Sequence, residues 1–128
     1  MIQNAPMSGK RTVVLGASTK PERYSNQAVR LLKEYGHPVI PVHPAEDTIE
    51  GLPVVHNLRE IHGPVDTVSV YLSPEAGAQM ADAIISLGPK RVILNPGAES
   101  DELEWELGEA GITVEHACTL VMLRTNQF

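Results

Sequence analysis

The sequence predicts an α/β fold, a single doubly wound and mostly parallel sheet of about five strands with helices on both faces. Two observations carry this prediction. Short apolar, mostly β-branched runs alternate along the chain with segments whose apolar residues recur every three or four positions. This alternation is typical of right-handed β-α-β units, which connect parallel strands. The length of 128 residues is enough for one domain with its own core.

The composition is that of a folded, acidic protein. Hydrophobic residues make up 42% of the chain, which argues against disorder. A net charge of −6 disfavours nonspecific binding to nucleic acid, because such binding needs a basic face. The single cysteine excludes an intramolecular disulfide and disfavours a cysteine zinc site. Neither a signal peptide nor a membrane span of about 18 apolar residues is evident, so we expect a cytoplasmic protein.

The first part of the chain predicts two strands around one helix. Residues 1–10 lack periodicity, and we expect a flexible leader there, followed by one domain over residues 11–128. The β-branched, apolar run Thr12–Leu15 predicts a central strand. Helical spacing of apolar residues then predicts an amphipathic helix over Asn26–Tyr35. A second apolar run predicts a strand at Val39–Val42.

The middle of the chain is less regular. Glycine and proline punctuate residues 45–64, where Val54–Val55 predicts a short edge strand and Leu58–Ile61 a helical turn. The alternation then resumes with strands at Val65–Leu72, Arg91–Leu94 and Ile112–Glu115, and with helices at Ala76–Leu87, Ser100–Ala110 and Cys118–Leu123.

Distinctive turns follow four of the predicted strands. The carboxyl ends of parallel strands meet at one edge of the sheet, and ligands bind there, near the point where the strand order reverses. We therefore expect these turns to line one crevice. They contain Gly16, Ala17 and Ser18 after the first strand, His43 and Pro44 after the second, Ser73 after the third, and Asn95, Pro96 and Gly97 after the fourth.

The first turn predicts a phosphate or pyrophosphate site. Small residues between a strand and a helix bring backbone N–H groups to the positive end of the helix, and Lys20 and Arg23 add cations. A tight strand–helix corner with solvated charges is the alternative interpretation. Ser73 also fits a simple helix cap, and Asn95 fits a residue that stabilises its own turn.

The same turn departs from the fingerprint of NAD-binding proteins. Gly16 has no glycine two or five residues further on, and His43 stands about where an acid would hold the NAD ribose. Both differences disfavour an ordinary NAD-dependent dehydrogenase.

In their order and spacing these segments resemble the small, single-domain CoA-binding protein family. Its Rossmann-like fold is related to the CoA-binding domain of the succinyl-CoA synthetase alpha subunit. The resemblance extends from about Lys10 to Phe128. Its main markers are V-L-G-A-S at 14–18, R-Y-S at 23–25, P-V-H-P at 41–44, Y-L-S-P at 71–74 and N-P-G at 95–97.

The resemblance implies that coenzyme A or an acyl-CoA is the ligand. It implies that the phosphates meet Gly16, Ala17 and Ser18, with help from Arg23 and Ser25. The adenosine end would be flanked by Pro41, Val42, His43 and Pro44. Further along the crevice the ligand would be bordered by Ser73, Asn95, Pro96 and Gly97.

No catalytic motif such as H-E-x-x-H, G-x-S-x-G or Walker A is present. The apolar surroundings of Cys118 in the sequence predict a buried, inert thiol, and Trp105 is expected to be a packing residue. We therefore expect a binding module that holds CoA or acyl-CoA for sensing, delivery or regulation of a partner. One alternative is an NAD(P)- or acyl-CoA-dependent enzyme with His43 or His116 as acid–base. Another is a structural subunit that docks on a larger ligase.

Overall fold

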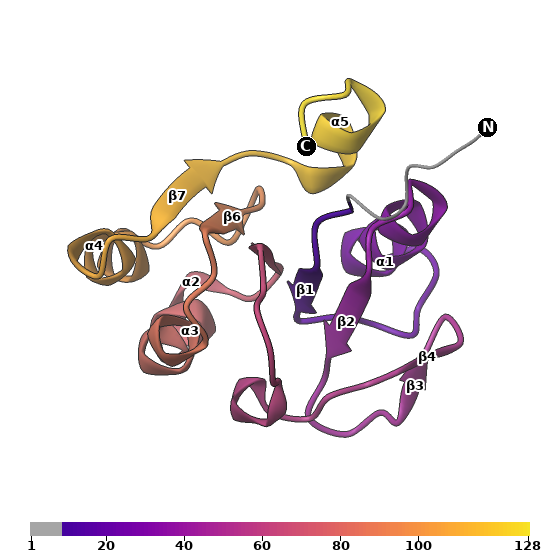
Figure 1. The fold of residues 1–128 in the computed structure, drawn as a ribbon, viewed down its shortest axis with the longest axis horizontal. Coiled ribbons are helices and arrows are strands. Elements are labelled where there is room, and N and C mark those ends of the chain that lie inside the picture. Colours follow the sequence, from indigo (N-terminus) through magenta and orange to yellow (C-terminus); the bar gives the residue numbers. More distant parts are fainter. Residues whose placement is uncertain (1–8) are drawn as a thin grey trace.

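A five-stranded parallel sheet forms the centre of the molecule in the computed structural model, which describes residues 9–128 (Figure 1). In the order β2-β1-β5-β6-β7, each strand is parallel to its neighbours. The predicted doubly wound sheet is therefore confirmed. The strands are β1 (Thr12–Leu15), β2 (Val39–Val42), β5 (Thr67–Val70), β6 (Arg91–Leu94) and β7 (Thr113–His116).

Helices cover both faces of the sheet. The helices α1 (Tyr24–Glu34) and α5 (Thr119–Arg124) pack against each other on one face (Figure 1). The other face is covered by α2 (Pro74–Ala78), α3 (Ala81–Leu87) and α4 (Asp101–Glu109). The segment between β2 and β5 forms a small antiparallel ribbon and a 3-10 turn. These are β3 (Thr48–Ile49), β4 (Leu52–Pro53) and η2 (Leu58–Glu60).

Strand alternation divides the core into two layers of different character. On the α3–α4 side the strands contribute aliphatic side chains such as Val68, Val70 and Leu94, which pack with Leu103 and Leu107 and have no exposed surface. Full burial of each such side chain contributes about 1.5–3 kcal/mol. The opposite layer is smaller and consists of Val14, Ala17, Val29, Leu32, Ile49 and Leu123.

The sheet face beneath α1 and α5 also carries buried polar side chains. Thr67 and Ser69 of β5 are both fully buried. The Thr67 hydroxyl donates to the Asp66 carboxylate (2.6 Å) and accepts from Arg91 Nε (3.1 Å) and Nη2 (2.9 Å). These partners satisfy the hydroxyl, so its burial leaves no hydrogen-bonding group unpaired.

The segment predicted as one helix at Ala76–Leu87 forms two helices, α2 and α3. The chain tightens between them, where Met80 N donates to Gly77 O (2.9 Å), a bond of the 3-10 type. The edge strand expected at Val54–Val55 is also displaced. Residues Leu52–Pro53 pair with β3 instead, and Val55 makes a single bridge to Val42.

Trp105 does not pack as expected, because 67% of its surface is exposed. The buried residues of α4 are Leu103 and Leu107, four positions apart on one helical face. Position 105 lies half a turn from both and therefore faces outward.

Of the leader expected at residues 1–10, residues 1–8 lie outside the described residues. Lys10 is held in place by a bond from its backbone N–H to His37 Nδ1 (2.9 Å) and by contact of its ammonium group with the Phe128 carbonyl. Among residues 9–128, no helix has the length and apolar character needed to cross a membrane.

The His37 environment predicts a pH dependence of stability. Its ring lies edge-on to Phe128, with centroids 4.9 Å apart. Burial lowers the pKa of His37 below 6.5, the charges of Lys10 and Arg91 lower it further, and Asp66 opposes them. Folding thus favours the neutral ring, and the stability this provides is complete above about pH 6.5 and is lost as the pH falls below it.

We expect the Tm to fall between about pH 7.5 and pH 5.5, and His37→Asn to reduce that fall because it removes the titrating ring while keeping an acceptor. Thermal melts over this pH range measure the effect. His62→Asn, at an exposed ring, is the matched control and should leave the pH dependence unchanged. An identical pH profile for His37→Asn and the parent would contradict the prediction.

Candidate ligand-binding site

The carboxyl ends of all five strands lie level along one edge of the sheet. Leu15 pairs with Val42 on one side and Val70 on the other, Val70 pairs with Leu94, and Leu94 pairs with His116. The chain reaches β2 from β1 through α1 on one side, whereas β5 lies on the other side of β1. The strand order therefore reverses at β1 and β5, where ligands bind in open α/β sheets.

The turn after β1 is fixed between its two neighbouring strands. Gly16 has a φ of +91°, and a Cβ atom on it would lie 2.9 Å from the Tyr71 carbonyl oxygen. Tyr71 N donates to Leu15 O (2.8 Å), and Ala17 N donates to Val42 O (3.1 Å). Only glycine fits this combination of left-handed backbone and close approach.

Two cations, with Glu22 between them, lie in the segment from the turn to the start of α1. Lys20 and Arg23 are both exposed. Arg23 precedes α1 without a side-chain cap, and the first turn of the helix contains no acidic residue. The positive end of the helix is therefore not neutralised by its own side chains, an arrangement that attracts an anion. Ser18 Oγ accepts from Lys20 N (3.0 Å) within the turn, and Ser25 is buried.

Asn26 is a structural part of this turn that the sequence did not reveal. It is fully buried in the first turn of α1. Its amide donates to Ser18 O (2.9 Å) and Glu50 Oε2 (3.0 Å), and its oxygen accepts from Arg30 Nε (2.8 Å). An asparagine at the start of an amphipathic helix gives no sign of such bonds, because the partner Glu50 lies 24 residues away.

The turn after β2 is held by the ring of His43. His43 Nδ1 accepts from the backbone N–H groups of Ala45 and Glu46, both at 3.0 Å. The neutral ring therefore carries its proton on Nε2. Pro41 O accepts from Val55 N (3.0 Å), and Val42 is 5% exposed, whereas Pro44 is exposed.

Asn95, directly after β6, is a buried centre of hydrogen bonds. Its side chain is 1% exposed. The amide nitrogen donates to Ser69 Oγ (3.0 Å) and Val70 O (2.9 Å), while the oxygen accepts from Thr119 N (2.9 Å). The Ser69 and Thr119 hydroxyls are bonded to each other (2.8 Å). The network joins β5, β6 and the first residue of α5.

Two neighbouring turns are stabilised locally. Ser73 Oγ accepts from Ala76 N (3.2 Å), so Ser73 caps α2. The Asn95 carbonyl accepts from Ala98 N (2.8 Å), and the Gly97 N–H donates to Glu99 Oε1 (2.8 Å). The predicted cap role of Ser73 is thus confirmed. The predicted turn role of the Asn95 side chain is wrong, because that side chain bonds to Ser69, Val70 and Thr119 and only the backbone carbonyl of Asn95 closes its own turn.

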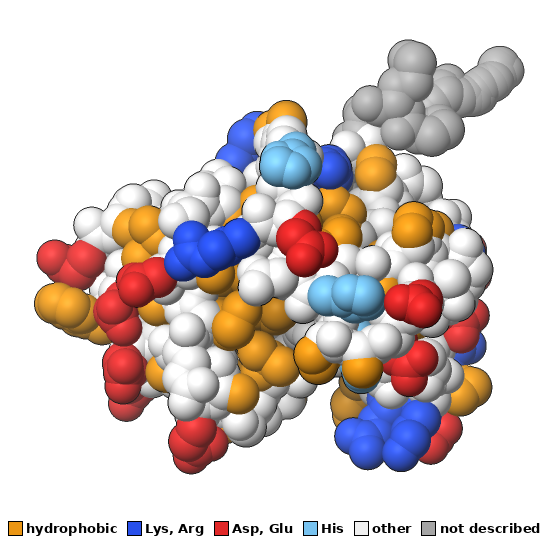
Figure 2. Space-filling model, turned by 90° about the horizontal axis from the view of Figure 1, so that it is seen from below, with side chains coloured by type: hydrophobic (Ala, Val, Ile, Leu, Met, Phe, Trp, Pro, Cys, Tyr) orange, Lys and Arg blue, Asp and Glu red, His pale blue; other side chains and the backbone are white. Residues whose placement is uncertain are grey.

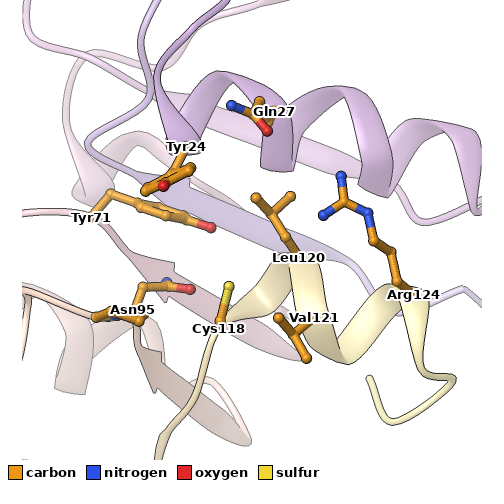
Figure 3. A pocket seen from close by; sticks show the side chains of 9 residues that line it. Tyr24, Gln27, Tyr71, Asn95, Cys118, Leu120, Val121 and Arg124 are labelled. Carbon is orange, nitrogen blue, oxygen red and sulfur yellow. The ribbon is translucent and has the colours of Figure 1, made fainter.

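A cavity of about 370 Å³ lies between α1 and α5, over the carboxyl ends of β5 and β6 (Figure 3). The α1 helix contributes Tyr24 and Gln27, and the loops after the strands contribute Tyr71, Asn95 and Pro96. The segment of α5 contributes Cys118, Leu120, Val121 and Arg124. Of the residues predicted to contact the ligand, Asn95 and Pro96 line this cavity. Tyr24 follows Arg23 directly and so lies between the cavity and the turn after β1 in the sequence.

The expectation of a buried Cys118 thiol is wrong. Cys118 is partly exposed, and its sulfur points into the cavity (Figure 3). The residue precedes α5 as its N-cap position. Its side chain therefore does not belong to the buried face of the helix, which Leu120 and Leu123 provide.

Tyr71 forms a wall of the cavity that sequence reasoning also missed. Its hydroxyl is buried and makes no hydrogen bond to the described residues. Burial raises the pKa of Tyr71 to about 12, although the nearby Ser69 and Thr119 hydroxyls oppose this shift. The phenol therefore keeps its proton at neutral pH and remains a hydrogen-bond donor.

The two histidines considered for acid–base chemistry lie outside the lining of this cavity. His116 Nε2 is 2.7 Å from Glu104 Oε1, at the end of β7. Within residues 9–128, no three His, Cys, Asp or Glu side chains are grouped to hold a metal ion.

Comparisons with known proteins agree with this geometry. A family model described as "CoA binding domain" matches residues 10–124. The curated protein YneT of Bacillus subtilis is 31% identical over 105 residues, which cover 82% of this chain and 78% of that protein. A crystal structure of an uncharacterized protein superposes with a TM-score of 0.88 at 41% identity, covering 94% of this chain and 99% of that one.

A more distant structure shares the fold. The dinucleotide-forming acetyl-coenzyme A synthetase 1 of Ca. Korarchaeum cryptofilum has a TM-score of 0.70 at 21% identity. The match covers 84% of this chain but 26% of the synthetase. The single domain described above therefore has the same fold as one part of a larger enzyme.

The packing of Gly16 predicts a difference between two glycine substitutions. Gly97 has a similar φ of +94°, but a Cβ atom there would meet nothing within 4 Å. We expect Gly97→Ala to cost about 1–2 kcal/mol through backbone strain alone, and Gly16→Ala to cost more because its Cβ also collides with the Tyr71 carbonyl. Urea unfolding of both variants measures the difference, and equal costs would contradict it.

The Asn95 network predicts a large loss of stability on truncation. Asn95→Ala removes the partners of Thr119 N, Val70 O and Ser69 Oγ in a buried place, so we expect a cost of about 2–4 kcal/mol in urea unfolding. Asn57→Ala is the control, because Asn57 caps η2 by accepting from Arg59 N (2.9 Å) at an exposed site, and about 1 kcal/mol is expected. A cost for Asn95→Ala no larger than that of the control would disprove the role of the network.

Proposed function

The chain belongs to the CoA-binding domain family, and from this premise we propose that it binds CoA or an acyl-CoA as a non-catalytic module. In this proposal the pyrophosphate lies at the turn between β1 and α1. The bound ligand serves sensing, delivery or regulation of a protein partner.

The observation that carries the proposal is the construction of that turn. It lies at the reversal of strand order, and its Gly16 backbone packs so closely against Tyr71 that the chain itself can carry no side chain at this position. Lys20 and Arg23 supply positive charge beside the first turn of α1, which contains no acidic residue of its own, although the Glu50 carboxylate accepts a bond from Asn26 there. A diphosphate is the ligand group that backbone N–H groups and two cations at such a place bind best.

The remaining turns support contacts along the rest of an extended ligand. We propose that the adenosine end lies beside Pro41, Val42, His43 and Pro44, because His43 follows β2 at the same level of the sheet edge as Gly16 follows β1. The pantetheine arm would then pass Ser73 and reach the Asn95–Gly97 turn, which follows the neighbouring strands β5 and β6.

Two titratable groups near the proposed site, Tyr71 and His43, support binding more than catalysis. Tyr71 retains its proton because burial raises its pKa to about 12. His43 Nδ1 is occupied by two backbone donors, which fixes the ring as part of its turn. A general base needs a free lone pair that can take up a proton. The Tyr71 phenol is protonated, and the Nδ1 lone pair of His43 is already used by Ala45 N and Glu46 N.

Calorimetric titration with CoA, dephospho-CoA, NAD and NADP tests the proposal. We expect saturable binding of CoA that weakens with added salt, and Lys20→Ala and Arg23→Ala should each weaken it several-fold to about tenfold, as lost contacts between an exposed cation and a phosphate do. Lys90→Ala is the matched control, since Lys90 is exposed at the opposite end of β6, and it should bind like the parent.

Clear binding of NADP without any response to CoA would refute the proposal. An equal loss of affinity in Lys90→Ala would show that general charge, and not the turn after β1, binds the ligand. Mass spectrometry of small molecules released from freshly purified protein provides an independent measurement.

A further inference from the structure

We propose that the cavity between α1 and α5 receives the acyl group of a short, aliphatic acyl-CoA. This inference rests on the proposed function, because CoA bound at the turn after β1 would deliver the acyl group. It adds the chemical class of the ligand and assigns a role to residues outside the turn.

The cavity opens beside the proposed phosphate site. Tyr24 and Gln27 in its wall belong to the first turn of α1, directly after Arg23. Tyr71 contacts both the turn after β1 and the cavity, because its carbonyl packs on Gly16 and its ring lines the cavity. The cavity also includes Asn95 and Pro96 in its wall, which the pantetheine arm of the proposed ligand reaches, so the acyl group beyond that arm would enter the cavity from there.

The lining of the cavity favours an uncharged, apolar guest. Leu120, Val121 and the rings of the two tyrosines form much of its walls (Figure 3), and Pro96 also lines it. The Asn95 amide is already satisfied by internal partners. Among the described residues that line the cavity none carries a carboxylate, and the single cation, Arg124, is exposed at the rim.

One polar group in the wall still lacks a partner. The buried Tyr71 hydroxyl makes no hydrogen bond with the described residues, and it points toward the space between Leu120 and Cys118 (Figure 3). A buried donor without an acceptor costs about 1–3 kcal/mol. The carbonyl oxygen of a thioester is an acceptor without charge, which suits a protonated phenol in apolar surroundings.

The size and the rim of the cavity limit the acyl chain. A volume of about 370 Å³ is at the lower end of ligand pockets, roughly 300–1,000 Å³, and therefore fits part of a CoA thioester with a short chain. Tyr24 is 70% exposed and Val121 is 55% exposed at this place. An aliphatic chain would cover these apolar surfaces, and each buried methylene raises affinity roughly fourfold.

Binding of a thioester series tests the inference on the full chain. Titration with acetyl-, butyryl- and hexanoyl-CoA should show about a sixteenfold gain in affinity from acetyl to butyryl, which adds two methylenes. Cys118 supplies a second readout, because it is the only cysteine of the chain and lines the cavity. Butyryl-CoA should slow its alkylation by iodoacetamide, while ADP, which lacks the acyl arm, should not.

A cavity-filling variant separates the acyl site from the CoA site. Val121→Trp places a large ring at the exposed rim and should reduce the butyryl-to-acetyl affinity ratio to about one, with acetyl-CoA still bound at the turn. Glu109→Trp is the matched control, because it adds an exposed tryptophan on α4 at the opposite face of the sheet, and it should keep the full ratio.

Different experimental results would refute the acyl site and the proposed CoA binding. If CoA binds but the thioester series is flat and Cys118 alkylation is unchanged, the acyl site is refuted and the proposed function stands. If neither CoA nor its thioesters bind, both are refuted. A succinyl-CoA affinity tenfold above that of butyryl-CoA, lost in Arg124→Gln, would overturn the aliphatic class.

Discussion

The buried hydrogen bonds of Asn95 are the constraint on which the arrangement of the site depends. A single side chain joins β5 through Ser69 and Val70, and joins α5 through Thr119. Because all of these groups are buried, a shift of any element would leave a donor or acceptor without a partner. The short α5 helix is thereby fixed over the sheet, although its own six residues would not form a stable helix alone.

The two faces of the sheet are packed differently, and the cavity lies on the face that α1 and α5 cover. Toward α3 and α4, the central strands present valine and leucine, and helical leucines fill the space between them. Toward α5, β5 presents Thr67 and Ser69, whose small side chains are used for hydrogen bonds. Small polar residues under a short helix leave room that a second aliphatic layer would have filled.

Periodicity and turn chemistry predicted most of the fold. Three strands have the predicted bounds, namely Thr12–Leu15, Val39–Val42 and Arg91–Leu94. Short β-branched runs that lie between turn residues form strands more readily than other secondary structures. The cavity was not predictable in this way. Tyr24, Tyr71 and Cys118 are far apart in the sequence, and only the parallel register and the position of α5 bring them together. Trp105 and Cys118 were misjudged because composition near a residue does not determine the direction of its side chain.

Tyr71 shows how the fold couples the turn to the cavity without a moving part. Its backbone N–H binds Leu15 O (2.8 Å), its carbonyl excludes any side chain at Gly16, and its ring forms part of the cavity wall. The distance between the turn after β1 and the cavity is therefore fixed by one residue, which follows the buried strand β5. A ligand that spans both places would find them already in position, so little of its binding free energy would be lost in ordering the protein. A small ordering cost is sufficient for a domain that holds an intact ligand. Catalysis would also require groups that bind the transition state more tightly than they bind the ligand itself.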